Sequence, residues 1–374
     1  MNYDVVLTEL TIDTFSKEEQ QMRSRTFECV DPSTLKEKLK VNVRTVNFIR
    51  TVRSSVKRIV NDVDNRVIVI IGPCSIHDVE STMDYCYRLS KVRAQLQQDL
   101  EVIMRAFLEK PRTSVGWKGL LNDPYLDRSS AIDNGLEASR KLYLQINKAN
   151  VPIGAECLNP IAVWFIHDLI SWGAIGARTT ESQTHREIAS GLPFTVGFKN
   201  NTEGAISTTI NSITAAGCPH YFLSVNKAGK PSTFATDGNS SCHLILRGGH
   251  KTTNYDSQSI NNASTYLMLT GLKSKVLIDV SHSNSKSNHV EQARVCKEVI
   301  KQINNGERKI LGVMMESYLT EGKQTSSECD SVCGCGCKAS YGKSITDACI
   351  GWPDSVDMFK ELAAAVRIRR KDSR

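Results

Sequence analysis

The sequence predicts an α/β fold, a (β/α)8 TIM barrel with an N-terminal extension and an inserted β-hairpin. From residue 66 onward, short β-branched apolar runs recur, and each is followed by a longer stretch with helical spacing. Strands that alternate with helices indicate βαβ units and a parallel sheet. The chain has 374 residues, of which 40% are hydrophobic, and α/β barrels commonly exceed the usual size of one domain. We therefore expect one barrel that carries extensions.

The expected strands lie at 67–71, 102–107, 152–157, 174–177, 195–198, 221–225, 244–246, 276–280 and 312–315. These are nine candidates for eight positions in a barrel. The run at 221–225 is followed by turn-rich sequence up to residue 241, without a helical pattern. We therefore assign residues 221–241 to the inserted hairpin and the other runs to the barrel.

Residues 1–65 are expected to form an N-terminal arm and helix that serve oligomerisation or regulation, and residues 66–374 the barrel. Asp31 followed by Pro32 is typical of a helix start. Apolar side chains then recur at helical spacing, at Phe48, Ile49, Val52, Val56 and Ile59. The basic residues between them are expected to face solvent, namely Arg50, Arg53, Lys57 and Arg58.

The charge and hydropathy patterns exclude two classes of partner. A formal net charge of +7 is small for this length and does not indicate a nucleic-acid binder. A basic helix at 50–58 is the alternative, and it would require strongly salt-dependent affinity. The N-terminus lacks signal-peptide features, and no apolar run approaches the ~20 residues of a membrane span. We expect a cytoplasmic protein whose 12 cysteines are thiols or ligands rather than disulfides.

Charged or metal-binding side chains follow nearly every predicted strand. In a barrel, the C-terminal ends of the strands meet at the active site. The residues at these ends are Cys74, Arg105, Lys110, Glu156, Arg178, Lys199, Arg247, His282 and Glu316. Any one of them could be a solvated loop residue, but gathering so many like charges is costly without a ligand. The set as a whole therefore predicts a binding site.

The set divides into two kinds of chemistry. Guanidinium and ammonium groups suit carboxylate and phosphate oxygens, so a polyanion is expected beside Arg105, Lys110, Arg178, Lys199 and Arg247. The remaining sulfur, nitrogen and oxygen donors, joined by one further carboxylate, are Cys74, His282, Glu316 and Asp347. Such a mixed set suits one divalent transition metal ion, Mn²⁺, Fe²⁺, Co²⁺ or Zn²⁺, better than Mg²⁺ or Ca²⁺.

Seven segments resemble the class I 3-deoxy-7-phosphoheptulonate (DAHP) synthases of the aromatic-amino-acid-regulated type. They are IGPCSIHD at 71–78, EKPRTSVGWKG at 109–119, GARTTESQ at 176–183, VGFKN at 196–200, LRGG at 246–249, DVSHSN at 279–284 and YGKSITDACIGW at 341–352. The likeness runs from about residue 45 to the C-terminus, with the segments in the same order and at compatible spacing.

The resemblance implies a metal-dependent transferase that condenses phosphoenolpyruvate with erythrose 4-phosphate, the first step of the shikimate pathway. It implies Cys74, His282, Glu316 and Asp347 as metal ligands, and Arg112 with Thr113 as the site for the sugar phosphate. Phosphoenolpyruvate would be bound by Arg105, Lys110, Glu156, Arg178, Lys199 and Arg247, with Glu156 orienting the attacking water. Lys110, Arg105 and His282 are the implied catalytic residues, with Lys110 as proton donor.

Two regions depart from the family pattern. Within a loop at about 325–340, four cysteines form a C-x₃-C-x-C-x-C run, at Cys329, Cys333, Cys335 and Cys337. This run is either a second thiolate metal site or redox-sensitive flap, or a Gly/Ser-rich surface loop. The resemblance also implies a feedback pocket for an aromatic amino acid at Asn159, Leu192, Pro193 and Ser224, where several residues are unusual for the family. A homo-dimer or homo-tetramer is implied as well.

Two further readings stay open from the sequence. A related synthase could condense phosphoenolpyruvate with a different phosphorylated sugar, although the KPRT loop at 110–113 resembles the four-carbon sugar site. A non-catalytic barrel could serve as a regulatory or metal-binding protein, but erosion of the ligand set would then be expected, and every expected ligand is present.

Overall fold

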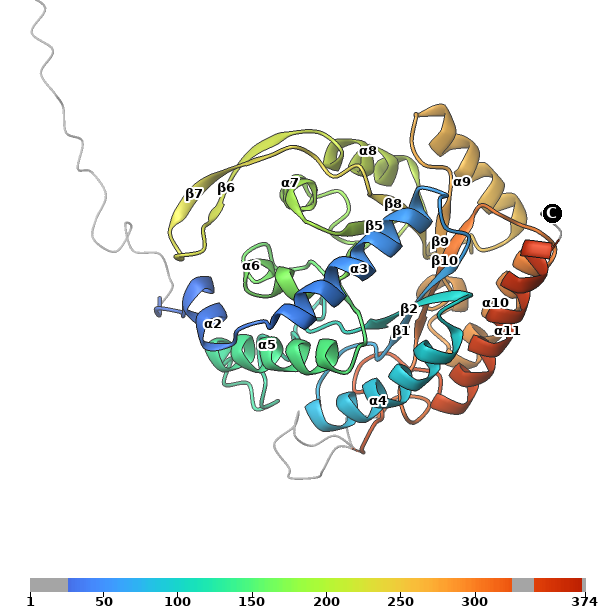
Figure 1. The fold of residues 1–374 in the computed structure, drawn as a ribbon. Helices are drawn as coiled ribbons and strands as arrows, with labels where there is room; N and C mark the ends of the chain where they lie inside the picture. Colours follow the sequence, from blue (N-terminus) through green and yellow to red (C-terminus); the bar gives the residue numbers. More distant parts are fainter. Residues whose placement is uncertain (1–25, 325–339, 372–374) are drawn as a thin grey trace, which may run out of the picture.

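The computed structural model describes residues 26–324 and 340–371. Eight parallel strands close into a barrel in the order β1-β10-β9-β8-β5-β4-β3-β2, which confirms the predicted fold (Figure 1). These strands are β1 (Val67–Gly72), β2 (Leu100–Arg105), β3 (Ile153–Glu156), β4 (Trp172–Ile175), β5 (Thr195–Lys199), β8 (His243–Leu246), β9 (Val276–Asp279) and β10 (Ile310–Glu316). The cysteine run at Cys329, Cys333, Cys335 and Cys337 lies outside the described residues.

Helices surround the barrel, as the alternation of patterns predicts (Figure 1). They are α4 (Val79–Leu96), α5 (Ile132–Lys148), α6 (Val163–Ile166), α7 (Gln183–Gly191), α8 (Ser207–Ala216), α9 (Ser257–Leu269), α10 (His289–Asn304) and α11 (Trp352–Lys371). Two short 3₁₀ turns, η1 (His167–Leu169) and η2 (His282–Ser285), lie in the connections. Among the described residues, no helix combines the length and apolar character needed to cross a membrane.

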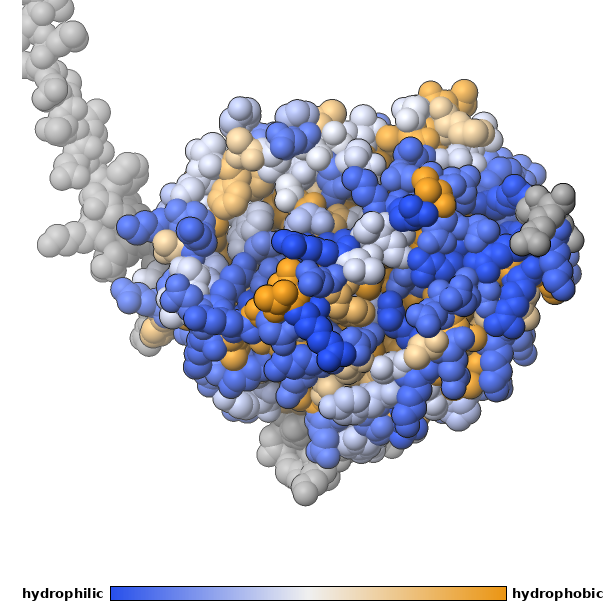
Figure 2. Space-filling model, viewed as in Figure 1, coloured by the Kyte–Doolittle hydropathy of each residue, from blue (hydrophilic) through white to orange (hydrophobic). Residues whose placement is uncertain are grey.

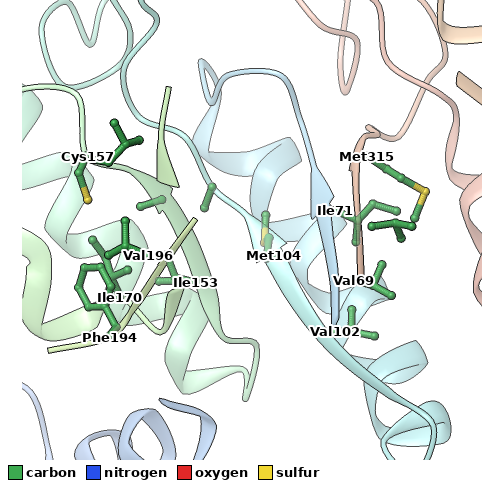
Figure 3. Packing of buried hydrophobic residues seen from close by; sticks show 14 of the residues in the cluster. Val69, Ile71, Val102, Met104, Ile153, Cys157, Ile170, Phe194, Val196 and Met315 are labelled. Carbon is green, nitrogen blue, oxygen red and sulfur yellow. The ribbon is translucent and has the colours of Figure 1, made fainter. Parts of the chain in front are cut away.

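Each barrel strand buries both of its faces, which explains why the strands appear in the sequence as continuous apolar runs. In β1, Val69 and Ile71 face the surrounding helices, where they pack with Val102, Met104 and Met315 (Figure 3). The alternate β1 residues point into the barrel and pack with inward-facing residues of other strands: Ile68, Ile70, Ile103, Trp172, Ile245, Leu277 and Met314. The barrel interior is therefore a filled core that holds the strand ends at fixed positions.

The N-terminal segment forms α2 (Pro32–Lys38), capped by Asp31, and α3 (Val43–Val60). Helix α3 crosses one end of the barrel, and its Val52, Val56 and Ile59 join the interior core (Figure 1). The prediction that Arg53 faces solvent is wrong. Its guanidinium donates to the carbonyls of His167 and Ile170, at the end of the turn η1, and lies over the ring of Phe194.

Strands β6 (His220–Val225) and β7 (Pro231–Thr236) form a separate two-stranded antiparallel sheet outside the barrel. Its inner face is aromatic: Phe222 stacks on Phe234, which in turn stacks on Trp164 of α6 at a ring distance of 4.9 Å. The Trp164 indole also donates to Ser224 Oγ at 2.9 Å. These contacts fix the hairpin against α6.

Candidate active site

A cavity of about 340 Å³ opens at the C-terminal ends of the barrel strands. Most of the residues predicted for the site, from strand ends or from the family resemblance, line it: Cys74, Arg105, Lys110, Arg112, Thr113, Glu156, Arg178, Lys199, Arg247, His282 and Asp347. Glu316 lies at its base and contacts Arg105 and His282. The barrel therefore brings together side chains that are as far as 273 residues apart in the sequence, as between Cys74 and Asp347.

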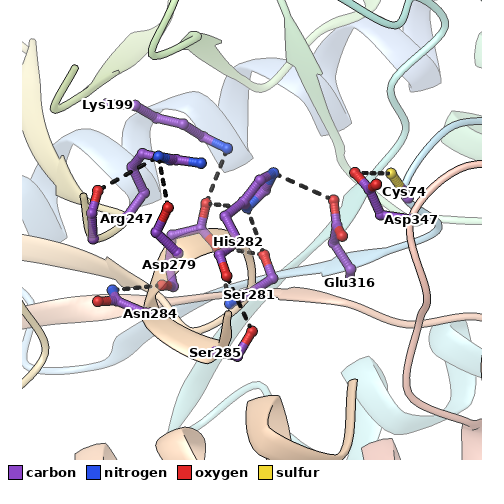
Figure 4. Close-up of polar contacts among 12 residues, drawn as sticks. Cys74, Lys199, Arg247, Asp279, Ser281, His282, Asn284, Ser285, Glu316 and Asp347 are labelled. Atoms are coloured by element: carbon purple, nitrogen blue, oxygen red, sulfur yellow. Dashed lines mark hydrogen bonds and ion pairs between the residues drawn. The ribbon is translucent and has the colours of Figure 1, made fainter. Parts of the chain in front are cut away.

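Three of the four predicted metal ligands form a compact cluster. One donor atom each from Cys74, Glu316 and Asp347 lies within 4.8 Å of the others. His282 Nε2 lies 3.6 Å from Glu316 Oε1, which places the fourth predicted ligand beside the cluster (Figure 4). Glu316 is buried, and its Oε1 has an ion pair with Arg105 at 3.0 Å but accepts no well-aligned hydrogen bond from the described residues, so it keeps a lone pair for a cation.

Two cations hold this cluster in place. Lys110 Nζ lies 2.8 Å from Cys74 Sγ and 2.7 Å from Asp347 Oδ2. Arg105, only 2% exposed, pairs with Glu316 at 3.0 Å and donates to the carbonyl of Cys74 at 2.6 Å. The guanidinium also lies over the Phe107 ring. Arg105 therefore ties Glu316 to the loop that carries Cys74.

The protonation of the cluster follows from burial and these charges. Burial, helped by the negative charge of Glu316, raises the pKa of the Cys74 thiol to about 11. Burial alone would also raise the pKa of Glu316, but His282, Arg105 and Lys110 hold it below its usual value. Burial opposes the charge on Lys110, yet the neighbouring thiol and carboxylates raise its pKa. Lys110 therefore carries a proton at neutral pH.

Asp279 belongs to the site, although the sequence argument gave it no role. It is fully buried at the end of β9, and its Oδ2 lies 2.9 Å from Lys199 Nζ and 3.0 Å from His282 Nδ1 (Figure 4). Burial opposes ionisation, but His282 and Lys199 hold the pKa of Asp279 far below its usual value. Because Nδ1 of His282 contacts Asp279, its Nε2 faces Glu316. The sequence did offer one signal for Asp279, because it is a single acidic residue within the apolar run at 276–280.

The anion-binding residues are arranged by depth. Lys199 is 5% exposed, Arg247 is half-buried, and Arg178 and Arg112 are exposed at the mouth of the cavity. Arg247 is oriented by Ser283 Oγ, which lies 3.1 Å from its Nη1, and its backbone N–H donates to Asn200 Oδ1 at 2.8 Å. In all, six cations and three carboxylates line the cavity, so it favours anionic ligands.

Glu109 is a second residue that sequence reasoning missed. Its side chain lines the cavity and is 9% exposed, and its Oε2 accepts the backbone N–H of Asn159 at 3.1 Å. Burial raises the pKa of Glu109 from 4.5 to about 7, against the opposing effect of this hydrogen bond. The carboxyl group therefore titrates near neutral pH at the edge of the site.

Comparison with known proteins gives the family. The sequence model of the DAHP synthetase I family matches residues 39–360. The chain belongs to this family. The Phe-sensitive phospho-2-dehydro-3-deoxyheptonate aldolase of Escherichia coli K12 is 47% identical over 343 residues, which are 92% of this chain and 96% of that protein. The tyrosine-inhibited phospho-2-dehydro-3-deoxyheptonate aldolase of Schizosaccharomyces pombe is 43% identical over 347 residues, which are 92% of each chain.

A third relative, the Trp-sensitive phospho-2-dehydro-3-deoxyheptonate aldolase of Buchnera aphidicola, is 46% identical over 340 residues, 91% of this chain and 95% of that protein. Among solved structures, the phospho-2-dehydro-3-deoxyheptonate aldolase of Francisella tularensis SCHU S4 superposes with a TM-score of 0.89 at 36% identity. The match covers 94% of this chain and all of that chain. These relatives show that the DAHP synthetase I fold extends over nearly the whole chain.

Three of the residues expected in the feedback pocket line two different hollows of the described structure. Leu192 and Pro193 line one hollow together with Arg53, while Asn159 lines another. The hydroxyl of Ser224 already accepts the hydrogen bond from Trp164. Its own O–H remains a donor that an effector could accept.

Proposed function

We propose that this chain is a DAHP synthase, a transferase that condenses phosphoenolpyruvate with erythrose 4-phosphate and water. The products are 3-deoxy-D-arabino-heptulosonate 7-phosphate and phosphate, and the reaction is the first step of the shikimate pathway. One observation carries this proposal: a single cavity joins a Cys/His/Glu/Asp cluster to a set of six cations. The names of the relatives, all phospho-2-dehydro-3-deoxyheptonate aldolases, support the same activity.

The cations bind and orient the two substrates. The buried Lys199 and the half-buried Arg247 hold the carboxylate and phosphate of phosphoenolpyruvate, together with the exposed Arg178 at the mouth. Arg112 and Thr113, exposed on the β2–α5 connection, bind the phosphate of erythrose 4-phosphate. This arrangement fixes the methylene carbon of one substrate against the aldehyde of the other, and positioning of this kind lowers the barrier by removing entropy before reaction.

The reaction needs an activated aldehyde and a proton for the new hydroxyl. A divalent ion held by Cys74, His282, Glu316 and Asp347 supplies Lewis-acid polarisation of the aldehyde oxygen when it is bound. The methylene carbon then attacks the aldehyde carbon, and Lys110 gives its proton to the oxygen that gains negative charge. Glu156 orients the water that adds to the phosphate-bearing carbon. Expulsion of phosphate completes the condensation. One proton of the added water restores Lys110, the other leaves with the phosphate, and Arg247 and Arg178 balance the charge of the leaving group.

Further properties follow as parts of the proposal. The ligand set accepts Mn²⁺, Fe²⁺, Co²⁺ or Zn²⁺. An aromatic amino acid is the effector class suggested by the Phe-sensitive, tyrosine-inhibited and Trp-sensitive relatives. Residues 1–65 serve regulation or assembly into a homo-dimer or homo-tetramer. The substrates are charged phosphate esters, which supports the cytoplasm as the site of reaction.

The experiment that tests the substrate assignment follows phosphoenolpyruvate by its ultraviolet absorbance with the purified chain and Mn²⁺. Erythrose 4-phosphate and, separately, a five-carbon sugar phosphate are added. We expect consumption with the four-carbon sugar and little with the longer one. Preference for the longer sugar would instead identify a related synthase. Added Phe, Tyr or Trp then tests the effector, and unchanged rates with all three would refute it.

A further inference from the structure

The side-chain amide of Gln292 makes two hydrogen bonds to the backbone of one residue, Glu316. Gln292 lies in the first turn of α10 and is 1% exposed. Its Nε2 donates to the Glu316 carbonyl at 2.9 Å, and its Oε1 accepts the Glu316 N–H at 2.7 Å. We propose that Gln292 is a positioning residue that fixes Glu316 as a metal ligand, an inference that rests on the metal site proposed above.

The strand arrangement explains why Glu316 needs such a partner. On one side of β10, strand β9 ends at Asp279, which is in register with Met314, two residues before Glu316. No β9 residue therefore reaches the backbone N–H of Glu316, and a buried N–H left unpaired is destabilising, whereas the Glu316 C=O also accepts from Ile350. The Gln292 amide presents one donor and one acceptor, as a neighbouring strand would. The Gln292 amide thereby extends the hydrogen bonding on the β9 side of β10 by one residue, to Glu316, whose side chain is the proposed metal ligand.

The same contact joins the segments that carry the other ligands. Helix α10 begins at His289, and three residues separate it from the end of the turn η2 that contains His282. The Glu316 carbonyl also accepts the N–H of Ile350 at 3.0 Å, three residues after Asp347. Through Gln292 and Ile350, the backbone of Glu316 therefore sets its distance to the segments of His282 and Asp347. Gln292 also lines the small hollow between Glu316, His282 and Asp347.

A fixed position of Glu316 is needed more for the affinity of a bound metal ion than for the stability of the fold. A carboxylate that moves by a fraction of an ångström loses a bond to a cation, and outer-shell partners of metal ligands typically contribute 10–100-fold in affinity. Loss of two hydrogen bonds elsewhere in the barrel lowers stability but leaves the ligand geometry intact. This difference separates a positioning role from a purely structural one.

The test is Gln292→Met, which keeps the side-chain volume and removes both hydrogen bonds. Gln302→Met is the matched control: Gln302 lies on the same helix, is 6% exposed, donates to the Tyr255 carbonyl at 2.9 Å and accepts from Ser257 Oγ at 3.0 Å. Binding of Mn²⁺ is titrated by the electron paramagnetic resonance of the free ion, and the Tm of the metal-free proteins is measured in parallel.

We expect both variants to lose Tm, but only Gln292→Met to weaken Mn²⁺ binding, with a Kd about 10–100-fold higher than that of the wild type. If Gln292→Met does not fold, Gln292→Asn replaces it, because its amide is one methylene too short to make both bonds, and the same rise in Kd is expected. Unchanged Kd values in both variants, beside a wild type that binds Mn²⁺, would refute the role of Gln292 and leave the proposed activity standing. A wild type that binds no Mn²⁺ would overturn the metal site and the role of Gln292 together.

Discussion

Glu109 makes the stability of this protein depend on pH in a direction that can be worked out. Because burial raises the pKa of Glu109 from 4.5 to about 7, the folded protein binds the Glu109 proton more tightly than the unfolded chain does. This contribution to stability is complete below pH 4.5 and is lost as the pH rises to 7. At about 1.4 kcal/mol per pKa unit, the loss is about 3 kcal/mol, an order-of-magnitude value.

Replacing Glu109 by Gln removes the titration and retains a neutral side chain of the same size. We expect the free energy of unfolding of Glu109→Gln to equal that of the wild type near pH 4.5 and to exceed it by about 3 kcal/mol above pH 7. Urea denaturation at a series of pH values measures this difference. Glu298→Gln, on the exposed face of α10, is the control and should show no such pH-dependent gain. A difference for Glu109→Gln that is the same at every pH would refute the argument.

Three other substitutions test individual parts of the site. Asp279→Asn leaves the buried Lys199 without its carboxylate, so the free energy of unfolding should fall by about 3–5 kcal/mol, as measured by urea denaturation. A much smaller fall would mean that another group balances the charge of Lys199. Arg112→Ala should raise the KM for erythrose 4-phosphate and leave the KM for phosphoenolpyruvate unchanged; the opposite pattern would place the sugar phosphate elsewhere. Lys110→Met should lower kcat by about 10²–10⁴-fold, and a nearly unchanged kcat would remove Lys110 as the proton donor.

The barrel was predictable from the sequence because its strands are buried on both faces. Runs such as 67–71 are then apolar throughout and end at a Gly-Pro turn or a polar residue, a pattern that locates both the strand and its functional end. The run at 221–225 was separable from the barrel because a turn follows it instead of a helix. The strand bounds were less accurate: β2 begins at Leu100, two residues before the predicted run, since the strand continues through the polar Glu101.

The side-chain partners could not be predicted in the same way. Arg53 occupies a position on a helix that is typical of a solvated residue, and only the tertiary structure brings the carbonyls of His167 and Ile170 to it. Gln292 likewise has no distinguishing neighbour in the sequence, because its role depends on where β9 ends relative to β10. The metal ligands and cations were identifiable because the barrel collects strand ends, whereas the residues that orient them depend on register and helix placement.

The most direct test of the proposed activity is the consumption of phosphoenolpyruvate by the purified chain with erythrose 4-phosphate, before and after chelation and again after Mn²⁺ is restored. We predict consumption that requires the sugar, stops on chelation and returns with Mn²⁺. Absence of consumption with every divalent metal ion tried would contradict the catalytic assignment and would favour a regulatory or metal-binding barrel.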